Sequence, residues 1–413
     1  MITLPFIDAH FHPLQMAYFR NAVDLSGVQN KDELKNKLEG VDDPIVGFHF
    51  VEFPGFDGEV LTKLFPNRPA IIIRTCLHKL WMNESAIAKF GEGLDIAEDG
   101  SVVEDGVWTV IDRVYSHYND VKKKLVRDLF IYLLSLGIVG GIEMGVSPED
   151  GRFMAETAAE IGFEYFYFVK SEYDPLDCMG ESRCLGVKLF ADGSLGARTA
   201  ALKEPYSDDP LTTGILNMSD EEMYKKVKVW HDAGYDVAVH VIGDRALSQV
   251  IRVFNGVLKD SPRPHRHRVE HLQIMYPGAI HDIYTLGLIP SIQPTFSIEI
   301  SWALKKVGRE RMHVSYRWKE LIEGGNVLIG TDAPVYGVRP YDVIRGLTDD
   351  SFWRDVGLEP ASVSLGKAID LYTNGNMKYL GLSLSLDLYR VEWKSFPYEV
   401  SKIISGGRVV YQS

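Results

Sequence analysis

The sequence predicts an α/β fold that is built from parallel βα units. Short apolar runs rich in β-branched and aromatic residues recur along the chain, and segments with helical periodicity lie between them. This alternation is typical of a parallel sheet covered by helices. An eight-stranded barrel would leave two strands for an insertion, and the pattern alone does not say which two. The ten predicted strands are Phe6–His10, Ile45–Phe50, Ala70–Thr75, Ile138–Glu143, Tyr165–Val169, Gly186–Ala191, Asp236–Val241, Arg268–Leu272, Ile289–Gln293 and Asn326–Thr331.

Capping patterns mark two of the predicted helices. Ser219 and the three acidic residues after it predict the start of a helix, and Gly234 predicts its end. The segment Pro360–Tyr372 has a similar pattern. We therefore expect a helix at each of these places.

Two regions fall outside the alternation. The stretch from about 54 to 117 is longer than a βα loop should be, which predicts an inserted lid or subdomain over the barrel mouth. Near the end of the chain, Leu384–Trp393 and Arg408–Gln412 have the pattern of short strands. We therefore expect a barrel domain over residues 1–380 and a small β-annex over residues 381–413.

Composition limits the classes of protein that fit. The chain has 413 residues, of which 46% are hydrophobic and 24% charged, and its net charge of −13 is spread along the sequence. A nucleic-acid footprint would need clustered Lys and Arg, so we expect no nucleic-acid partner. No apolar run approaches the ~18 to 20 residues that cross a bilayer, and the first residues lack a signal pattern. Three cysteines, Cys76, Cys178 and Cys184, without a CxxC pair fit a reducing compartment. These features predict a cytoplasmic protein with no membrane partner.

Polar residues end several of the predicted strands. His10 and His12 are two residues apart, so in a strand they point to the same face and can converge on one cation. His240, His271 and Asp332 each close an apolar, strand-like run. Active sites of βα barrels are assembled at the C-terminal ends of the strands, and three such endings by chance would be a triple coincidence. The pattern therefore predicts a metal site.

Lys188 lies inside an apolar predicted strand, where an unpaired ammonium is unfavourable. At about 4 Å from a dication it would be repelled by roughly 8 kcal/mol at an effective dielectric near 20, so a protonated lysine cannot be a metal ligand. Two interpretations stay open. Lys188 is either carbamylated by carbon dioxide, which makes it an anionic ligand able to bridge two metals, or it faces away from the metals in an ion pair.

Several motifs resemble the amidohydrolase-3 branch of the amidohydrolase superfamily, which includes N-substituted formamide deformylases. The similarity is strong and in order across about residues 185 to 335 and patchy before them. It rests on the segments Val187–Ala200, Ala238–Ala246, Arg268–His271 and Gly330–Pro334, with earlier echoes in Asp8–His12 and His78–Asn83.

This resemblance implies a (β/α)8 TIM-like barrel with two zinc ions. The first two histidines would bind one zinc, the second pair would bind the other, a carbamylated lysine would bridge them, and an aspartate would complete the first site. Asp332 would also be the general base, and His78 would contact a substrate oxygen. The implied metal ligands are His10, His12, Lys188, His240, His271 and Asp332.

The resemblance also implies an activity. The enzyme would cleave a carbon–nitrogen bond other than a peptide bond, of the amide type, in a small N-acyl or N-formyl compound, by means of a hydroxide that bridges the metals. One alternative is a one-metal deaminase of the same superfamily, which needs no bridging ligand. Another is a non-catalytic metal-binding barrel. Imidazole and carboxylate ligands suit several divalent metals, so zinc is not the sole choice.

The chain departs from this family at its ends. Most members begin with some fifty residues that supply strands to a small β-sandwich, and this chain begins at the strand of His10 and His12. We therefore expect the C-terminal annex to be a remnant of that sandwich. Its exposed edges could be covered by a second subunit. A homodimer is the hypothesis that follows.

Overall fold

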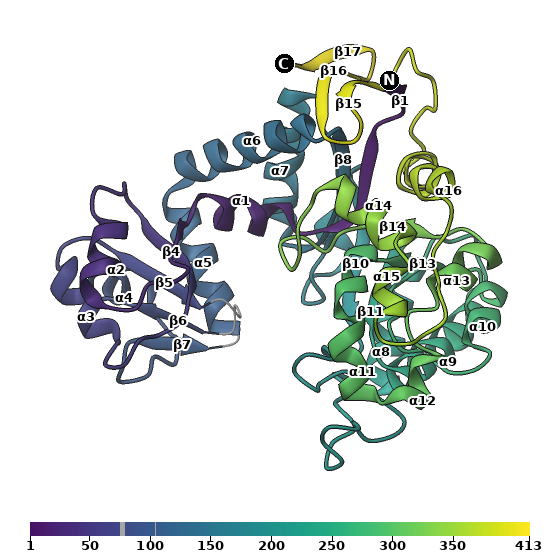
Figure 1. Cartoon of the computed structure of the whole chain (residues 1–413), viewed down its shortest axis with the longest axis horizontal. Helices are drawn as coiled ribbons and strands as arrows, with labels where there is room; N and C mark the ends of the chain where they lie inside the picture. The colour runs from purple at the N-terminus through teal and green to yellow at the C-terminus, as the bar shows by residue number, and fades with distance from the viewer. Residues whose placement is uncertain (75–78, 104) are drawn as a thin grey trace. The chain divides into compact units, whose positions relative to one another are not determined.

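A parallel sheet of eight strands is the centre of the computed structural model (Figure 1), which describes residues 1–74, 79–103 and 105–413. Backbone hydrogen bonds from the residues after the last strand nearly close this sheet into a barrel, since Thr331 and Asp332 both donate to the carbonyl of His10 (3.1 and 2.7 Å). The predicted (β/α)8 barrel is confirmed. In sheet order its strands are β14 (Leu328–Ile329), β13 (Ile289–Ile292), β12 (Arg268–His271), β11 (Asp236–Val241), β10 (Cys184–Phe190), β9 (Glu164–Val169), β8 (Ile138–Val146) and β2 (Phe6–Phe11).

The chain divides into two compact units. One unit contains Met1–Pro13 and Phe130–Ser413 and holds the barrel, and the other contains Leu14–Leu129. The two predicted strands that do not belong to the barrel are Ile45–Phe50 and Ala70–Thr75, which lie in the second unit. Their sequences are as apolar as those of the barrel strands because they too are buried on both faces.

Helices follow most of the barrel strands. Apolar residues of α9 recur at helical spacing, at Leu247, Val250, Phe254 and Val257, and all four are buried. The main helices of this unit are α7 (Pro148–Ile161), α8 (Asp220–Asp232), α9 (Asp244–Asp260), α10 (Ala279–Thr285), α11 (Ile300–Val307), α12 (Arg309–Met312), α13 (Trp318–Gly324), α14 (Pro340–Thr348), α15 (Ser351–Arg354), α16 (Leu365–Asp370) and α17 (Asn376–Tyr379). Short η1 (Pro175–Cys178), η2 (Pro294–Glu299) and π-helical η3 (Leu371–Gly375) complete the set.

The two capped helices have different outcomes. In α8 the Ser219 hydroxyl accepts from the Glu222 backbone (3.2 Å) and the Glu222 carboxylate accepts from the Ser219 backbone (2.8 Å), so the predicted cap is present. The helix predicted at Pro360–Tyr372 begins only at Leu365, because the side chain of Ser364 caps it. Residues 360–363 are not helical.

The second unit has its own sheet and core. Its five strands are in the order β3 (Val23–Asp24), β4 (Ile45–Phe50), β5 (Ala70–Arg74), β6 (Lys79–Met82) and β7 (Ser101–Val103), the first three parallel and the rest antiparallel. Leu25, Leu34, Leu61 and Trp81 are buried in its core. The insertion predicted at about 54–117 lies inside this unit. The helices of the second unit are α2 (Lys31–Leu38), α3 (Gly58–Leu64), α4 (Glu84–Phe90) and α5 (Asp105–His117). Helices α1 (Pro13–Asn21) and α6 (Asn119–Ser135) connect the second unit to the first along the chain.

Both chain ends meet in a third sheet, at the top of Figure 1. Its antiparallel strands are in the order β1 (Ile2–Thr3), β15 (Arg390–Ser395), β16 (Glu399–Ser405) and β17 (Arg408–Gln412). The strand predicted at Leu384–Trp393 begins only at Arg390, since backbone hydrogen bonds to the Ser385 carbonyl form a turn before it. The sheet packs on the barrel through Trp393, whose ring lies 5.9 Å from that of Phe6.

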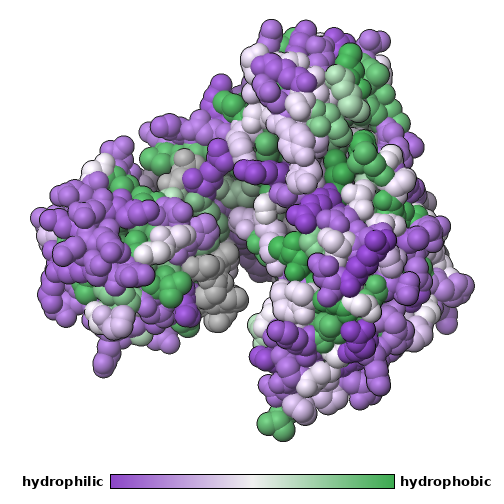
Figure 2. All heavy atoms as spheres, viewed as in Figure 1, coloured by the Kyte–Doolittle hydropathy of each residue, from purple (hydrophilic) through white to green (hydrophobic). Residues whose placement is uncertain are grey.

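The cysteines and the surface complete the description. Cys178 and Cys184 are buried and joined in a disulfide, whereas the sequence led us to expect unpaired thiols, and Cys76 lies outside the described residues. Among the described residues, no helix has both the length and the apolarity to span a bilayer. Hydrophilic side chains dominate the visible face of each unit in Figure 2.

Candidate metal centre

Three predicted ligands meet where the first and last barrel strands join. Nε2 of His10 and Nε2 of His12 lie 3.2 and 3.1 Å from the same oxygen, Oδ1 of Asp332. The candidate ligand atoms of these three residues all lie within 4.8 Å of one another. Gly330 allows this approach, because a Cβ at that position would lie only 2.5 Å from Cβ of His10. The local sequence thus brings two imidazoles and one carboxylate to a single point.

Two further carboxylates orient the imidazoles. Nδ1 of His10 lies 2.6 Å from Oε2 of Glu270, and Nδ1 of His12 lies 3.3 Å from Oε1 of Glu143. A proton on Nδ1, donated to these acids, leaves the Nε2 lone pair free for a cation. Arg268 donates two hydrogen bonds to Glu270 (2.8 and 3.0 Å). Burial alone would raise the pKa of Glu270, but the charges of Arg268 and His10 outweigh burial and hold this pKa well below its ordinary value.

His240 and His271 form a second pair beside the first. Their ring centroids are 4.5 Å apart, and the ring of His271 lies 4.8 Å from that of His10. Nε2 of His240 lies 3.0 Å from the carbonyl oxygen of Gly193, so a proton there leaves Nδ1 for a ligand. Nδ1 of His271 is buried and has no hydrogen-bond partner among the described residues. Burial lowers the pKa of His240 to about 4 and that of His271 well below the ordinary value, which keeps both rings neutral as metal ligands must be.

Lys188 points to the same interior face of the barrel. It pairs with Ala238 on β11, and His240 lies two residues further along that strand. The lysine is 1% exposed, and its Nζ lies 5.1 Å from the centre of the Phe190 ring. No ion pair links its ammonium to any residue that the structure describes. Burial lowers its pKa to about 8, although nearby carboxylates favour the charged form.

The donor set fits a divalent cation. Burial opposes a charge on His12, but its hydrogen bonds to Asp332 and Glu143 outweigh burial and raise the pKa of the imidazole to about 9. The carboxylates therefore favour a positive charge at this point, which a metal ion would supply. Nδ1 of His271, which has no hydrogen-bond partner among the described residues, is a nitrogen that could bind a cation. Nitrogen and oxygen donors of this kind suit zinc and several other divalent metals.

Asp192 holds the loops around the centre in place. It is 1% exposed, and its carboxylate accepts hydrogen bonds from the backbone of Ala201 (2.9 Å), Ile242 (3.0 Å) and Gly243 (2.8 Å). The carboxylate also lies 3.6 Å from Nε2 of His240. Asp192 therefore ties the loop after β10 to the loop after β11, the strand that carries His240.

Asp244 and His49 belong to other elements of the structure. Asp244 begins helix α9 and accepts from the backbone of Lys203 (2.9 Å), so it has a structural role at a loop. His49 lies on β4 of the second unit, half-exposed and 3.3 Å from Asp24. His78, the predicted contact to a substrate oxygen, lies outside the described residues.

Sequence reasoning missed the acids behind the imidazoles. Glu143 and Glu270 are 2% and 0% exposed, which places charged groups inside the barrel. A signal was present in each case. Glu143 ends a predicted strand as the predicted ligands do, and Arg268 and Glu270 alternate with apolar residues directly before His271. Charged residues at alternate positions of a buried strand indicate an internal ion pair.

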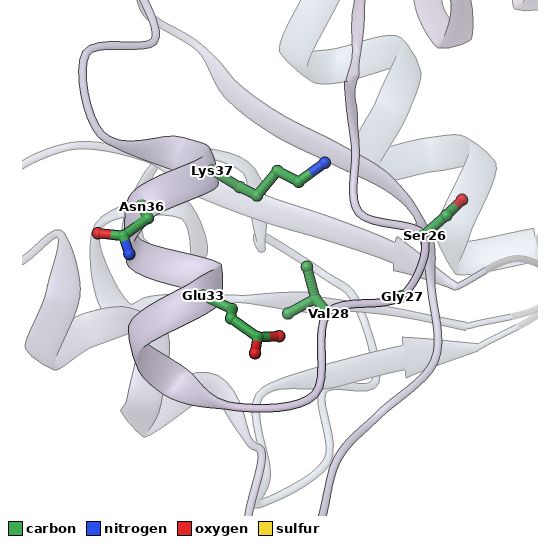
Figure 3. A pocket seen from close by; sticks show the side chains of 6 residues that line it. All are labelled: Ser26, Gly27, Val28, Glu33, Asn36 and Lys37. Atoms are coloured by element: carbon green, nitrogen blue, oxygen red, sulfur yellow. The ribbon is translucent and has the colours of Figure 1, made fainter.

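The second unit holds a shallow pocket of about 400 Å³ (Figure 3). Its one acid, Glu33, already accepts from the backbone of Gln29 and from the side chain of Asn30, both at 2.8 Å. Figure 3 shows a loop facing helix α2 across this pocket. No cluster of metal-ligating side chains lies there among the described residues. The lining residues are Ser26, Gly27, Val28, Glu33, Asn36 and Lys37.

Known proteins resemble this chain along most of its length. A sequence model of the amidohydrolase family matches residues 2–385. An uncharacterized metal-dependent hydrolase from Pyrococcus furiosus is 28% identical with a TM-score of 0.80, and the match covers 92% of this chain and 82% of that one. Its counterpart from Pyrococcus horikoshii OT3 is 25% identical with a TM-score of 0.82, over 96% and 86% of the two chains. The YtcJ protein of Bacillus subtilis (strain 168) is 27% identical over 421 residues, which are 90% of this chain and 78% of YtcJ.

Proposed function

The chain belongs to the amidohydrolase family, and from that premise we propose that it hydrolyses an amide-type carbon–nitrogen bond, other than a peptide bond, in a small N-acyl or N-formyl compound. The observation that carries this proposal is the convergence of His10, His12 and Asp332 on one point at the C-terminal end of the barrel. Metal-dependent hydrolases are among the solved structures that resemble the chain.

Each predicted ligand has a place in the proposed centre. His10, His12 and Asp332 would hold one ion, and His240 and His271 would hold a second. When bound, zinc polarises a substrate carbonyl and makes hydroxide available near neutral pH. Other divalent metals with the same ligand preference are alternatives.

Asp332 is the proposed proton carrier. Burial is outweighed by the neighbouring imidazoles of His10 and His12, which hold the pKa of this carboxyl well below its ordinary value. The side chain is therefore ionised at neutral pH and able to accept a proton. Its place between the two imidazoles lets it take a proton from the attacking water and deliver it to the leaving nitrogen.

Lys188 is proposed to carry a carbamate. The neutral amine reacts with carbon dioxide, forming one N–C bond and releasing one proton. With a pKa of about 8, about a tenth of Lys188 is neutral at pH 7, and its burial protects the product. The alternative role in an ion pair lacks a partner among the described residues.

A one-metal deaminase is the second candidate. The observation in its favour is that only His10, His12 and Asp332, within the described part of the chain, bring their ligand atoms within 4.8 Å of one another. A non-catalytic barrel is the third, and it needs neither bound metal nor turnover. The cytoplasmic location and the homodimer stay predictions from the sequence.

The test combines metal content with a substrate panel. We expect zinc-loaded protein to hydrolyse members of a panel of N-formyl and N-acyl amines and amino acids. Asp332→Asn should lose turnover by at least about a hundredfold, because it removes both a ligand and a base. Asp387→Asn, which changes an exposed carboxylate in a turn, is the matched control. Release of ammonia from a heterocyclic amine, without activity on any amide, would favour the deaminase.

A further inference from the structure

Gln293 directly follows β13 and carries a carboxamide that has no hydrogen-bond partner among the described residues. The residue is 1% exposed, and neither Nε2 nor Oε1 has a hydrogen-bond partner within the described ranges of the chain. Buried amides normally satisfy both groups, because an unpaired buried donor or acceptor is unfavourable. Two unpaired atoms on one side chain at the mouth of a barrel therefore need an explanation.

Strand geometry places this side chain inside the barrel. The Ser291 hydroxyl, two residues earlier, accepts from Nη2 of Arg268 (3.0 Å), which also binds the carboxylate of Glu270 beside His10. Gln293 has extended backbone angles (φ −117°, ψ 90°). Alternation along the strand then puts its side chain on the same interior face as Ser291, one step nearer the C-terminal mouth.

Its neighbour across the sheet touches the metal centre. The Gly330 amide donates to the carbonyl of Ile292 (3.0 Å), so Gly330 lies beside Gln293 on the adjoining strand. A Cβ on Gly330 would lie 2.5 Å from Cβ of His10. Gly330 therefore lies between Gln293 and His10, the first predicted metal ligand.

The surroundings hold Gln293 firmly and leave it free for a ligand. Gly346 of α14 packs against the turn after it, since a Cβ there would lie 2.0 Å from the carbonyl oxygen of Pro294. A second amide near this end, Gln273, is satisfied within the protein. It donates to Glu299 (2.7 Å) and to the hydroxyl of Tyr316 (3.2 Å). Gln293 differs because neither Nε2 nor Oε1 of its carboxamide has a hydrogen-bond partner among the described residues.

We propose that Gln293 is a substrate-binding residue that recognises an amide edge through both atoms of its carboxamide. Nε2 donates to the substrate carbonyl oxygen, and Oε1 accepts from the substrate N–H. The pair of hydrogen bonds requires donor and acceptor on the same edge, as in a primary carboxamide, a lactam or a cis formamide. This inference rests on the proposed function, because it assigns the substrate class of the same site.

The test compares two rings of equal size by ligand-observed NMR. The probe 2-pyrrolidinone carries a cis-amide edge, and cyclopentanone lacks its N–H. In wild-type protein the lactam should bind more tightly. Gln293→Met keeps the side-chain length but removes two hydrogen bonds to the lactam and one to the ketone, so the dissociation constant of the ketone divided by that of the lactam should fall about fivefold, for one net hydrogen bond of about 1 kcal/mol. The melting temperature of Gln293→Met should stay equal or rise, since the variant buries no unpaired polar atom.

Gln249→Met is the matched control. Gln249 is equally buried, lies on α9, and donates to the Met218 carbonyl (2.8 Å) and to Asp220 (3.0 Å). Its variant should melt at a lower temperature and leave the ratio unchanged. An unchanged ratio in Gln293→Met, or no binding of either ring to wild-type protein, would overturn the inference. Amide hydrolysis with a ratio independent of Gln293 refutes this inference alone, whereas a dependent ratio without any amide hydrolysis refutes the proposed function alone.

Discussion

Asn376 links the two strands whose meeting completes the barrel. It is 1% exposed, and its Nδ2 donates to the carbonyls of Ile7 (2.6 Å) and Ile329 (2.7 Å), while its Oδ1 accepts from the Ile329 amide (3.1 Å). Asn376→Leu removes all three hydrogen bonds and buries their backbone partners unpaired. At about 1 kcal/mol for each bond, the loss is at least about 3 kcal/mol.

Hydrogen exchange followed by mass spectrometry measures this loss locally. A cost of about 3 kcal/mol corresponds to exchange roughly a hundredfold faster in the peptides of β2 and β14, since 1.36 kcal/mol is a factor of ten. Peptides of β4 and β5, in the other unit, are the internal reference. Asn374→Leu is the matched control, because Asn374 is only partly buried and its side chain bonds only to Asp370 among the described residues. Acceleration below about fivefold in β2 and β14 would refute the role of Asn376 in closing the barrel.

Three further predictions follow from the packing, the metal centre and the sheet edges. Burial, with the nearby rings of His265 and His231, lowers the pKa of His267 from 6.5 to about 2, so between these values the unfolded chain binds a proton that the folded chain does not. The free energy of unfolding should therefore fall by about 1.4 kcal/mol for each pH unit below 6.5. Urea titrations at several pH values measure this dependence, and in His267→Gln the free energy of unfolding should fall less steeply with pH. An equal dependence on pH in the variant would show that His267 is not its source. Glu270→Gln should weaken zinc binding about 10- to 100-fold, measured in competition with a chelator, because Glu270 orients the imidazole of His10. An unchanged affinity would contradict that role. Strand β17 lies at the edge of its sheet and exposes Val409, and a second subunit could cover this edge. Analytical ultracentrifugation at micromolar concentration should therefore show a dimer, and a single monomer species would contradict the homodimer.

The sequence predicted the parts of the fold that depend on local pattern. The eight barrel strands, the Ser219 cap and the strand-end positions of His240, His271 and Asp332 all follow from alternation and spacing. Strands β4 and β5 could not be assigned to the second unit, because burial on both faces gives them the same apolar composition as barrel strands.

Contacts between segments that are far apart in the chain could not be predicted from the sequence. Asn376 and Ile7 are 369 residues apart, and His10 and Glu270 are 260 apart, so no local pattern relates them. The carboxamide of Gln293 looked like the polar end of an ordinary strand until its burial and lack of partners were known. Such residues are identified by what surrounds them in space.

The most direct test of the metal centre is a crystal structure of zinc-loaded protein with anomalous data at the zinc edge. We expect two anomalous peaks in each chain, one beside His10, His12 and Asp332 and the other beside His240 and His271. Electron density for a carbamate should extend from Nζ of Lys188 between them. One peak with an unmodified lysine would contradict the two-metal hydrolase and favour the deaminase, and no peak would contradict a metal centre at all.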